Sequence, residues 1–150
     1  MKDTNRQEPK GILLITGTVG SGKTTVATEV GEQLADMSLP NAVIDLDWLG
    51  WVNVGNDFKA YDQLIMQNII STWPNYRKIG VEYLVLARML LQREPLDVLA
   101  KAFPGTPIIT VKLVASKNTL EKRLSQRDSG ETLQEHLGEI ESMNKVLDEL

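Results

Sequence analysis

The sequence predicts an α/β domain in which a parallel sheet is flanked by helices. Short apolar runs alternate along the chain with segments whose apolar residues recur at helical spacing. This alternation is typical of strand–helix–strand units joined by right-handed crossovers. In addition, residues 17–24 fit the phosphate-binding pattern G-x-x-x-x-G-K-[ST] and stand between the first apolar run and the first helical pattern. Both observations favour a fold that presents a phosphate-binding loop at the carboxyl edge of the sheet.

The residue types of this loop explain why it would bind phosphate. Gly17, Gly20 and Gly22 permit positive φ and a close approach of the backbone, so that N–H groups and a helix N-terminus point at an anion. Lys23 supplies a charge for the β- and γ-phosphates, and the Thr24 hydroxyl is placed to hold Mg²⁺. A glycine-rich turn that merely joins strand to helix is the alternative. The complete motif with its flanks favours binding of a nucleoside triphosphate.

Apolar runs in the sequence predict the strands, and the segments between these runs have the apolar spacing of helices. Strands are expected at residues 12–15, 42–44, 83–87 and 108–114, the last apolar enough for burial on both faces. Helices are expected at residues 23–36, from 58 to a break near Trp73-Pro74, and at residues 95–102, and two more finish the chain. In the first of these final helices, Leu120 and Leu124 form the inward stripe, and Arg123 and Arg127 lie beside it.

Charged residues follow two of the predicted strands. Asp45 and Asp47 come directly after the second strand, where period-two spacing places both on one side of the chain, and Arg88 directly follows the third. Because α/β proteins bind ligands at the carboxyl ends of parallel strands, we expect all three side chains near the phosphate loop. The alternative for the two carboxylates is a solvated cap at the strand end. For Arg88, acceptor binding and a structural ion pair stay equally open.

Other polar and aromatic residues also have two interpretations. Trp48 and Trp51 could stack a planar ligand, but large aromatic side chains more often pack in a core, so we assign them to packing. His136 is assigned to packing as well. Arg123 and Arg127 either extend along the apolar seam or contact phosphate, and their place beside the seam favours phosphate.

Composition narrows the class of protein. A chain of 150 residues suffices for one domain, expected at residues 11–150 after a disordered polar tail at residues 1–10. The chain has no cysteine and one histidine, so neither a disulfide framework nor a zinc site is expected. Charges of both signs are interspersed at a net charge of −4, and the first ten residues include no apolar stretch. We therefore expect a cytoplasmic monomer or homodimer with no membrane or nucleic-acid partner.

These segments together resemble the small P-loop phosphotransferases related to nucleoside monophosphate kinases. That family includes shikimate kinase, gluconate kinase, adenylylsulfate kinase and chloramphenicol phosphotransferase. The resemblance rests on residues 17–24, on Asp45 and Asp47, and on residues 120–127, which are similar to the lid of these enzymes. It implies a P-loop NTPase fold, a mobile lid near residues 123–130, and transfer of the γ-phosphoryl group of ATP, with Mg²⁺, to a hydroxyl of a small molecule.

The resemblance also implies a role for each candidate residue. Lys23, Asp47 and Arg127 would be catalytic, with Asp47 as the base beside the acceptor hydroxyl. Thr24 and Asp45 would lie at the metal, although which of the two aspartates is the base and which is on the metal side stays open. The acceptor would contact Asp45, Asp47 and Arg88. The nucleotide would be bound by Gly17, Gly20, Ser21, Gly22, Lys23, Thr24, Thr25 and Arg123.

Two departures from the family pattern leave alternatives open. The third strand ends in Ala87-Arg88 instead of an acid, so a metal carboxylate would have to come from Asp45 or Asp47. The family's fifth strand should follow the last helix, where this sequence ends, so we expect either a truncated C-terminus or a sheet of four strands instead of five. The alternative functions are a nucleotide-binding regulatory NTPase and a degenerate relative that binds ATP without catalysis. The identity of the acceptor is not encoded in any recognisable motif.

Overall fold

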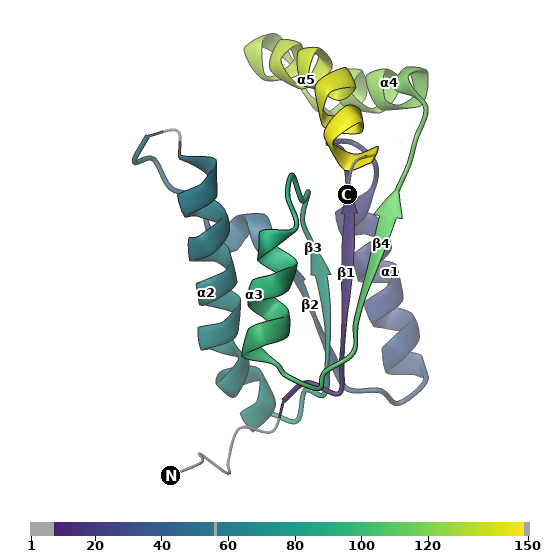
Figure 1. Ribbon diagram of the computed structural model, residues 1–150. Helices are drawn as coiled ribbons and strands as arrows, with labels where there is room; N and C mark the ends of the chain where they lie inside the picture. The colour runs from purple at the N-terminus through teal and green to yellow at the C-terminus, as the bar shows by residue number, and fades with distance from the viewer. Residues whose placement is uncertain (1–7, 56, 149–150) are drawn as a thin grey trace.

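The computed structural model describes residues 8–55 and 57–148. These residues form a parallel sheet with α2 and α3 on one face and α1 on the other, and a pair of helices, α4 and α5, lies beyond the carboxyl edge (Figure 1). The predicted α/β fold with a parallel sheet is confirmed. The elements in chain order are β1 (Gly11–Gly17), α1 (Lys23–Asp36), β2 (Asn41–Asp45), the 3₁₀ helix η1 (Leu46–Leu49), α2 (Phe58–Lys78), β3 (Tyr83–Ala87), α3 (Glu94–Ala102), β4 (Ile108–Leu113), α4 (Lys117–Arg127) and α5 (Gly130–Asp148).

The sheet has the strand order β2-β3-β1-β4 with every pairing parallel. Side chains of the two central strands alternate between its faces because successive residues of a strand point to opposite sides. Ile12 and Leu14 of β1 join the core cluster under α2 and α3, whereas Ile15 joins the cluster under α1. Burial on both faces explains why β1 and β3 read as continuous apolar runs in the sequence.

The prediction that β4 is buried on both faces is wrong. Ile109 is 62% exposed and Val111 is 39% exposed. β4 lies at the edge of the described sheet and pairs with β1 alone, while α1 packs against β1, β2 and β3. An apolar run therefore indicates a strand here, but its position in the sheet decides which of its side chains are covered.

The predicted break near Trp73-Pro74 is also wrong, because α2 continues through Pro74 to Lys78. A proline inside a helix costs about 3 kcal/mol. Trp73 is 5% exposed and its ring meets Phe103 edge-on, with ring centroids 6.4 Å apart. Tyr76, on the far side of the proline, packs against the same core cluster. Burial of large side chains on both sides of Pro74 offsets the cost of the lost hydrogen bond.

Residues 8–10 of the predicted disordered tail lie against the body of the domain. The Thr106 hydroxyl donates to the Pro9 carbonyl at 2.9 Å, and the Lys10 N–H donates to the Glu82 carbonyl at 2.7 Å. Residues 8–10 are therefore bound to the body of the domain, and the rest of the predicted tail, residues 1–7, lies outside the described residues. Within the described part of the chain, no helix has both the length and the apolar character needed to span a membrane.

The pair formed by α4 and α5 packs against the phosphate loop. Leu120, Leu124 and Ile140 are fully buried between the two helices, and Val19 of the loop packs against them. A Cβ atom added to Gly20 would lie 3.3 Å from the Leu124 side chain. This close approach holds the cationic side chains of α4 near the loop.

Candidate active site

The loop between β1 and α1 leaves backbone donors available for an anion. Gly22 precedes α1 with a φ of +97°, and no side chain caps the helix N-terminus. The first N–H groups of α1 are therefore not occupied by a side-chain cap. Gly17 is required for a different reason, because a Cβ atom there would lie 2.7 Å from the Leu113 carbonyl oxygen of the neighbouring strand. The glycines thus fix both the conformation of the loop and its close packing on β4.

The loop lines a cavity of about 490 Å³, here called the loop cavity. Its wall consists of residues 20–26 together with Arg123 and Arg127 of α4. Every predicted nucleotide-binding residue except Gly17 lies on this wall, Thr25 and Arg123 included. Arg123 Nη1 donates to the carbonyl oxygens of Gly20 and Ser21, at 3.3 and 3.4 Å. The structure therefore brings the loop and both arginines together around one space.

Thr24 and Asp45 form an oxygen-rich pair at the edge of this loop. The Thr24 hydroxyl donates to Asp45 Oδ2 at 2.8 Å. Two oxygen donors beside nucleotide phosphates suit Mg²⁺, which keeps several waters and is usually bound through one or two carboxylates plus phosphate oxygens. Among the described residues no cluster of three or more His, Cys, Asp or Glu side chains forms a separate metal site. The pair predicted for the metal fits Mg²⁺ in donor chemistry.

Asp45 and Asp47 do not share the face of a strand, so that part of the prediction is wrong. Asp45 ends β2, whereas Asp47 lies in η1, and Asp45 Oδ1 accepts from the Asp47 N–H at 3.1 Å as the cap of that helix. The strand ends at Asp45, and Leu46, the first residue of η1, is fully buried. Both carboxylates nevertheless lie at the carboxyl edge of the sheet beside the phosphate loop.

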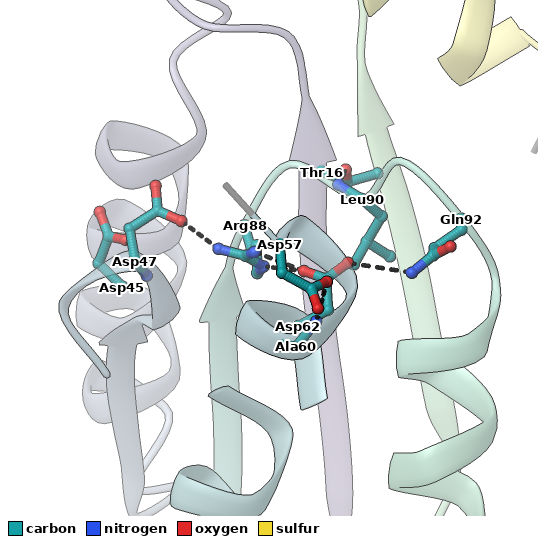
Figure 2. Close-up of polar contacts among 9 residues, drawn as sticks. All are labelled: Thr16, Asp45, Asp47, Asp57, Ala60, Asp62, Arg88, Leu90 and Gln92. Carbon is teal, nitrogen blue, oxygen red and sulfur yellow. Dashed lines mark hydrogen bonds and ion pairs between the residues drawn. The ribbon is translucent and has the colours of Figure 1, made fainter. Parts of the chain in front are cut away.

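Arg88 is held between two carboxylates (Figure 2). Its Nη1 donates to Asp47 Oδ1 at 2.7 Å, while its Nε and Nη2 donate to Asp62 Oδ1 at 3.2 and 2.5 Å. Gln92 Nε2 donates to the other oxygen of Asp62 at 3.3 Å. Of the two interpretations that the sequence leaves open for Arg88, the structure contains the ion pair. The arrangement fixes the position of the Asp47 carboxylate.

Asp62 is a site residue that sequence reasoning missed. It is 8% exposed and lies on the buried face of α2. Ile65, Met66 and Ile69 follow it at helical spacing on that face and are buried. The sequence did contain a signal for Asp62, because it is an acidic residue within the apolar stripe of an amphipathic helix. A carboxylate buried in such a stripe requires a hydrogen-bonding or charged partner.

Lys23 lies close to the charged side chains of Asp45, Asp47 and Arg127. Its Nζ donates to the Thr18 carbonyl oxygen at 2.9 Å. Burial lowers the pKa of Lys23 below its usual value, and the nearby carboxylates of Asp47 and Asp45 oppose this change. Both aspartates are therefore close enough to act on the ammonium group electrostatically.

A second cavity, of about 520 Å³, is also lined by Lys23. We call it the helix cavity because one wall is α5, which contributes His136, Glu139, Met143 and Val146 among others. The remaining wall comes from Val19, Lys23, Asp47 and the connection between β3 and α3. Lys23 lines both cavities. A group that extends from the loop cavity past Lys23 would meet Asp47.

The two tryptophans after Asp47 do not pack in the core, so the packing assignment is wrong. Trp48 and Trp51 are 75% and 73% exposed, and their rings stack on each other with centroids 5.7 Å apart. In η1, Leu46 is buried and Leu49 packs against the main core cluster. Because these two leucines point inward, Trp48 lies on the exposed side of the short helix. Trp51 follows the helix and stacks on Trp48.

Asp128 connects the end of α4 to α5. Its carboxylate accepts from Arg127 Nε and Nη2 at 2.8 and 3.0 Å, and it lies 2.6 Å from His136 Nδ1. The packing assignment of His136 is therefore incomplete. The hydrogen bonds from Arg127 and then from His136 lower the pKa of Asp128 to about 2, from an ordinary value of 3.8.

We expect Asp128→Asn to destabilise the protein at neutral pH and to have less effect in acid. Because the pKa of Asp128 is lower in the folded state, its contribution is present above about pH 4 and is lost as the pH falls towards about 2. Urea unfolding midpoints of both proteins should differ at neutral pH, differ by about half as much at pH 3, and converge as the pH falls to about 2. Asp36→Asn, at an exposed position of α1, serves as the control. A difference that persists undiminished in acid would contradict the prediction.

A family described as "AAA domain" matches residues 13–144. No curated protein matches the sequence. Similar solved structures include a gluconokinase from Sinorhizobium meliloti 1021, with 21% identity and a TM-score of 0.56 over 88% of this chain and 75% of that one. An APS kinase from Mycobacterium tuberculosis, in complex with AMPPNP and APS, has 22% identity and a TM-score of 0.59 over 77% of this chain and 69% of that one.

A third similar structure is a tunicamycin resistance protein from Deinococcus radiodurans. It has 15% identity and a TM-score of 0.59, and the match covers 93% of this chain and 94% of that one. TM-scores of 0.56 to 0.59 at identities of 15–22% show that the fold is shared. The chain shares its fold with the gluconokinase and the APS kinase, and the resemblance in the sequence implied a P-loop fold of this kind.

Proposed function

The chain belongs to the AAA-domain family that matches residues 13–144, and on that premise we propose that it is a kinase that transfers the γ-phosphoryl group of ATP to a hydroxyl of a small molecule. The observation that carries this proposal is the position of Lys23 in the walls of both cavities. The loop cavity, with its uncapped helix N-terminus and two arginines, suits the nucleotide phosphates. The helix cavity, with Asp47 in its wall, suits the acceptor.

Each residue has a chemical role in this proposal. Lys23 and Arg127 would neutralise charge on the transferred phosphoryl group, and Arg123 would stabilise the loop through its carbonyl contacts. Asp47, held by Arg88, would accept the proton of the acceptor hydroxyl. Thr24 and Asp45 would hold Mg²⁺, which supplies further charge neutralisation when bound. Ser21 has a buried hydroxyl with no partner among the described residues, next to the expected phosphates.

The proposal is tested by measuring ADP formation with Mg-ATP in the absence and presence of hydroxylated metabolites, with mass spectrometry for the phosphorylated product. Acceptor-dependent ADP formation and a product heavier by one phosphoryl group are the expected results. ATP hydrolysis that no acceptor accelerates would favour the regulatory NTPase, and nucleotide binding without turnover would favour the degenerate relative. The cytoplasmic location, the single domain at residues 11–150 and the oligomeric state stay predictions.

We expect Arg127→Ala to lower kcat by about 10²-fold while changing the Kd of Mg-ATP much less, because its charge would act mainly on the transition state. In the structure, Asp128 holds the Arg127 guanidinium in a bidentate contact. Closure of the lid around residues 123–130 would bring this guanidinium to the phosphoryl group. Gly130 begins α5 with a φ of +59° and would serve as the hinge of this movement.

Steady-state kinetics and calorimetry measure kcat and Kd separately. Lys122→Ala removes an exposed cation from the same helix and is the control. Equal losses in kcat and nucleotide affinity for Arg127→Ala would instead indicate ground-state binding.

A further inference from the structure

The chemistry of the helix cavity identifies the class of molecule it can hold. The apolar part of its wall is formed by Val19, Met89, Leu91, Met143 and Val146. Leu90 fixes the β3–α3 connection, since it is 2% exposed and its N–H donates to the Thr16 hydroxyl at 2.9 Å. The flanking residues Met89 and Leu91 are thereby held at the cavity (Figure 2 shows this anchor). A wall of this kind stabilises an apolar body by removing its surface from water.

The charged groups of the helix cavity are Lys23, Asp47 and Glu139. Lys23 also lines the loop cavity, where the nucleotide phosphates need it. Arg88, the next cation along the sheet edge, is engaged by Asp47 and Asp62. Once Lys23 binds the nucleotide phosphates, the charged groups that face the body of an acceptor are the carboxylates of Asp47 and Glu139. They would repel an anionic compound and attract a cation.

His136 adds a hydrogen-bonding position to this wall. Its Nδ1 is occupied by Asp128, which fixes the ring and leaves Nε2 for a ligand in the cavity. On α5, His136, Met143 and Val146 recur at spacings that keep them on one side of the helix. The cavity thus combines an apolar surface, one imidazole and two carboxylates.

We propose that the acceptor is an uncharged or cationic hydroxyl compound with an apolar body, which lies against α5 with its hydroxyl at Asp47. This inference rests on the proposed function. In the transfer, the acceptor oxygen forms a bond to the γ-phosphorus, the bond from that phosphorus to the bridging oxygen of ADP breaks, and the hydroxyl proton passes to Asp47. A volume of about 520 Å³ suffices for a molecule of this kind.

Three probes of one size separate charge from shape: 3-phenyl-1,2-propanediol is neutral, phenylalaninol is cationic and 3-phenyllactate is anionic. Their Kd values for the full chain, saturated with AMPPNP, are measured by titration in ¹H–¹⁵N NMR. The diol and phenylalaninol should bind with shifts in the helix cavity, and phenyllactate should bind at least about tenfold more weakly. Equal or tighter binding of phenyllactate, or no binding by any of the three, would overturn the inference.

Variants on two elements test the location. Met143→Glu and Leu91→Glu should each weaken diol binding about tenfold or more, whereas Gln134→Glu adds the same charge at an exposed position of α5 and should not. Glu139→Lys should improve phenyllactate binding. Unchanged diol affinity in both wall variants would refute the site. Failure of the proposed function is distinguishable, because it would appear as absent Mg-ATP binding or transfer while the probe affinities remain measurable.

Discussion

Lys23→Ala is expected to weaken Mg-ATP binding by about 10- to 100-fold and to abolish detectable phosphoryl transfer. A hydrogen bond to a charged group contributes about 1.5–3 kcal/mol, which corresponds to that range. Lys23 lies between the two cavities and close to Asp45 and Asp47, so no other described side chain occupies the same position. Its loss also removes charge neutralisation at the transferred group, which adds to the effect on kcat.

Calorimetry with Mg-ATP and the coupled ADP assay measure the two effects of this substitution. The variant should fold, because burial already disfavours the charged form of Lys23 in the absence of nucleotide. Lys122→Ala, on the exposed side of α4, is the matched control and should behave like the parent protein. Undiminished affinity and turnover in Lys23→Ala would mean that this loop is not the phosphate site.

Asp47→Asn is expected to leave nucleotide binding nearly intact and to slow phosphoryl transfer by about 10²- to 10⁴-fold, the range of a positioned general base. The structural argument is that Asp47, whose Oδ1 accepts from Arg88 Nη1 at 2.7 Å, lines the helix cavity and is not among the residues that line the loop cavity. Arg88 keeps its second partner, Asp62, in the variant, so the local structure should persist.

Single-turnover transfer and the Kd of Mg-ATP are the measurements for this variant. Asp45→Asn is the informative comparison, because Asp45 contacts Thr24 and should alter the dependence of the rate on Mg²⁺ concentration. Asp36→Asn controls for the loss of one acidic charge. If Asp47→Asn transfers phosphate at the parent rate, Asp47 has a positioning role at most.

The contiguous parts of the site could be predicted because their geometry is local. Residues 17–24 encode their own conformation through glycine, and the apolar run before them and the helical pattern after them belong to one strand–loop–helix unit. The bounds of α1 and β3 likewise agree with the sequence prediction, since burial on both faces of a central strand leaves a continuous apolar run. The sequence by itself therefore determined the fold class, the phosphate loop and the edge of the sheet where charged residues gather.

Tertiary structure alone decided which distant residues meet. Arg88 is paired with Asp62 across 26 positions of sequence, and the helix cavity combines the loop after β1 with α5. The exposure of β4, the course of α2 through Pro74 and the outward tryptophans also depend on what packs beside each element. The periodicity of a segment shows whether it has an apolar side. Whether that side is buried depends on the residues that pack against it, which are often distant in the sequence and so are not part of the local pattern.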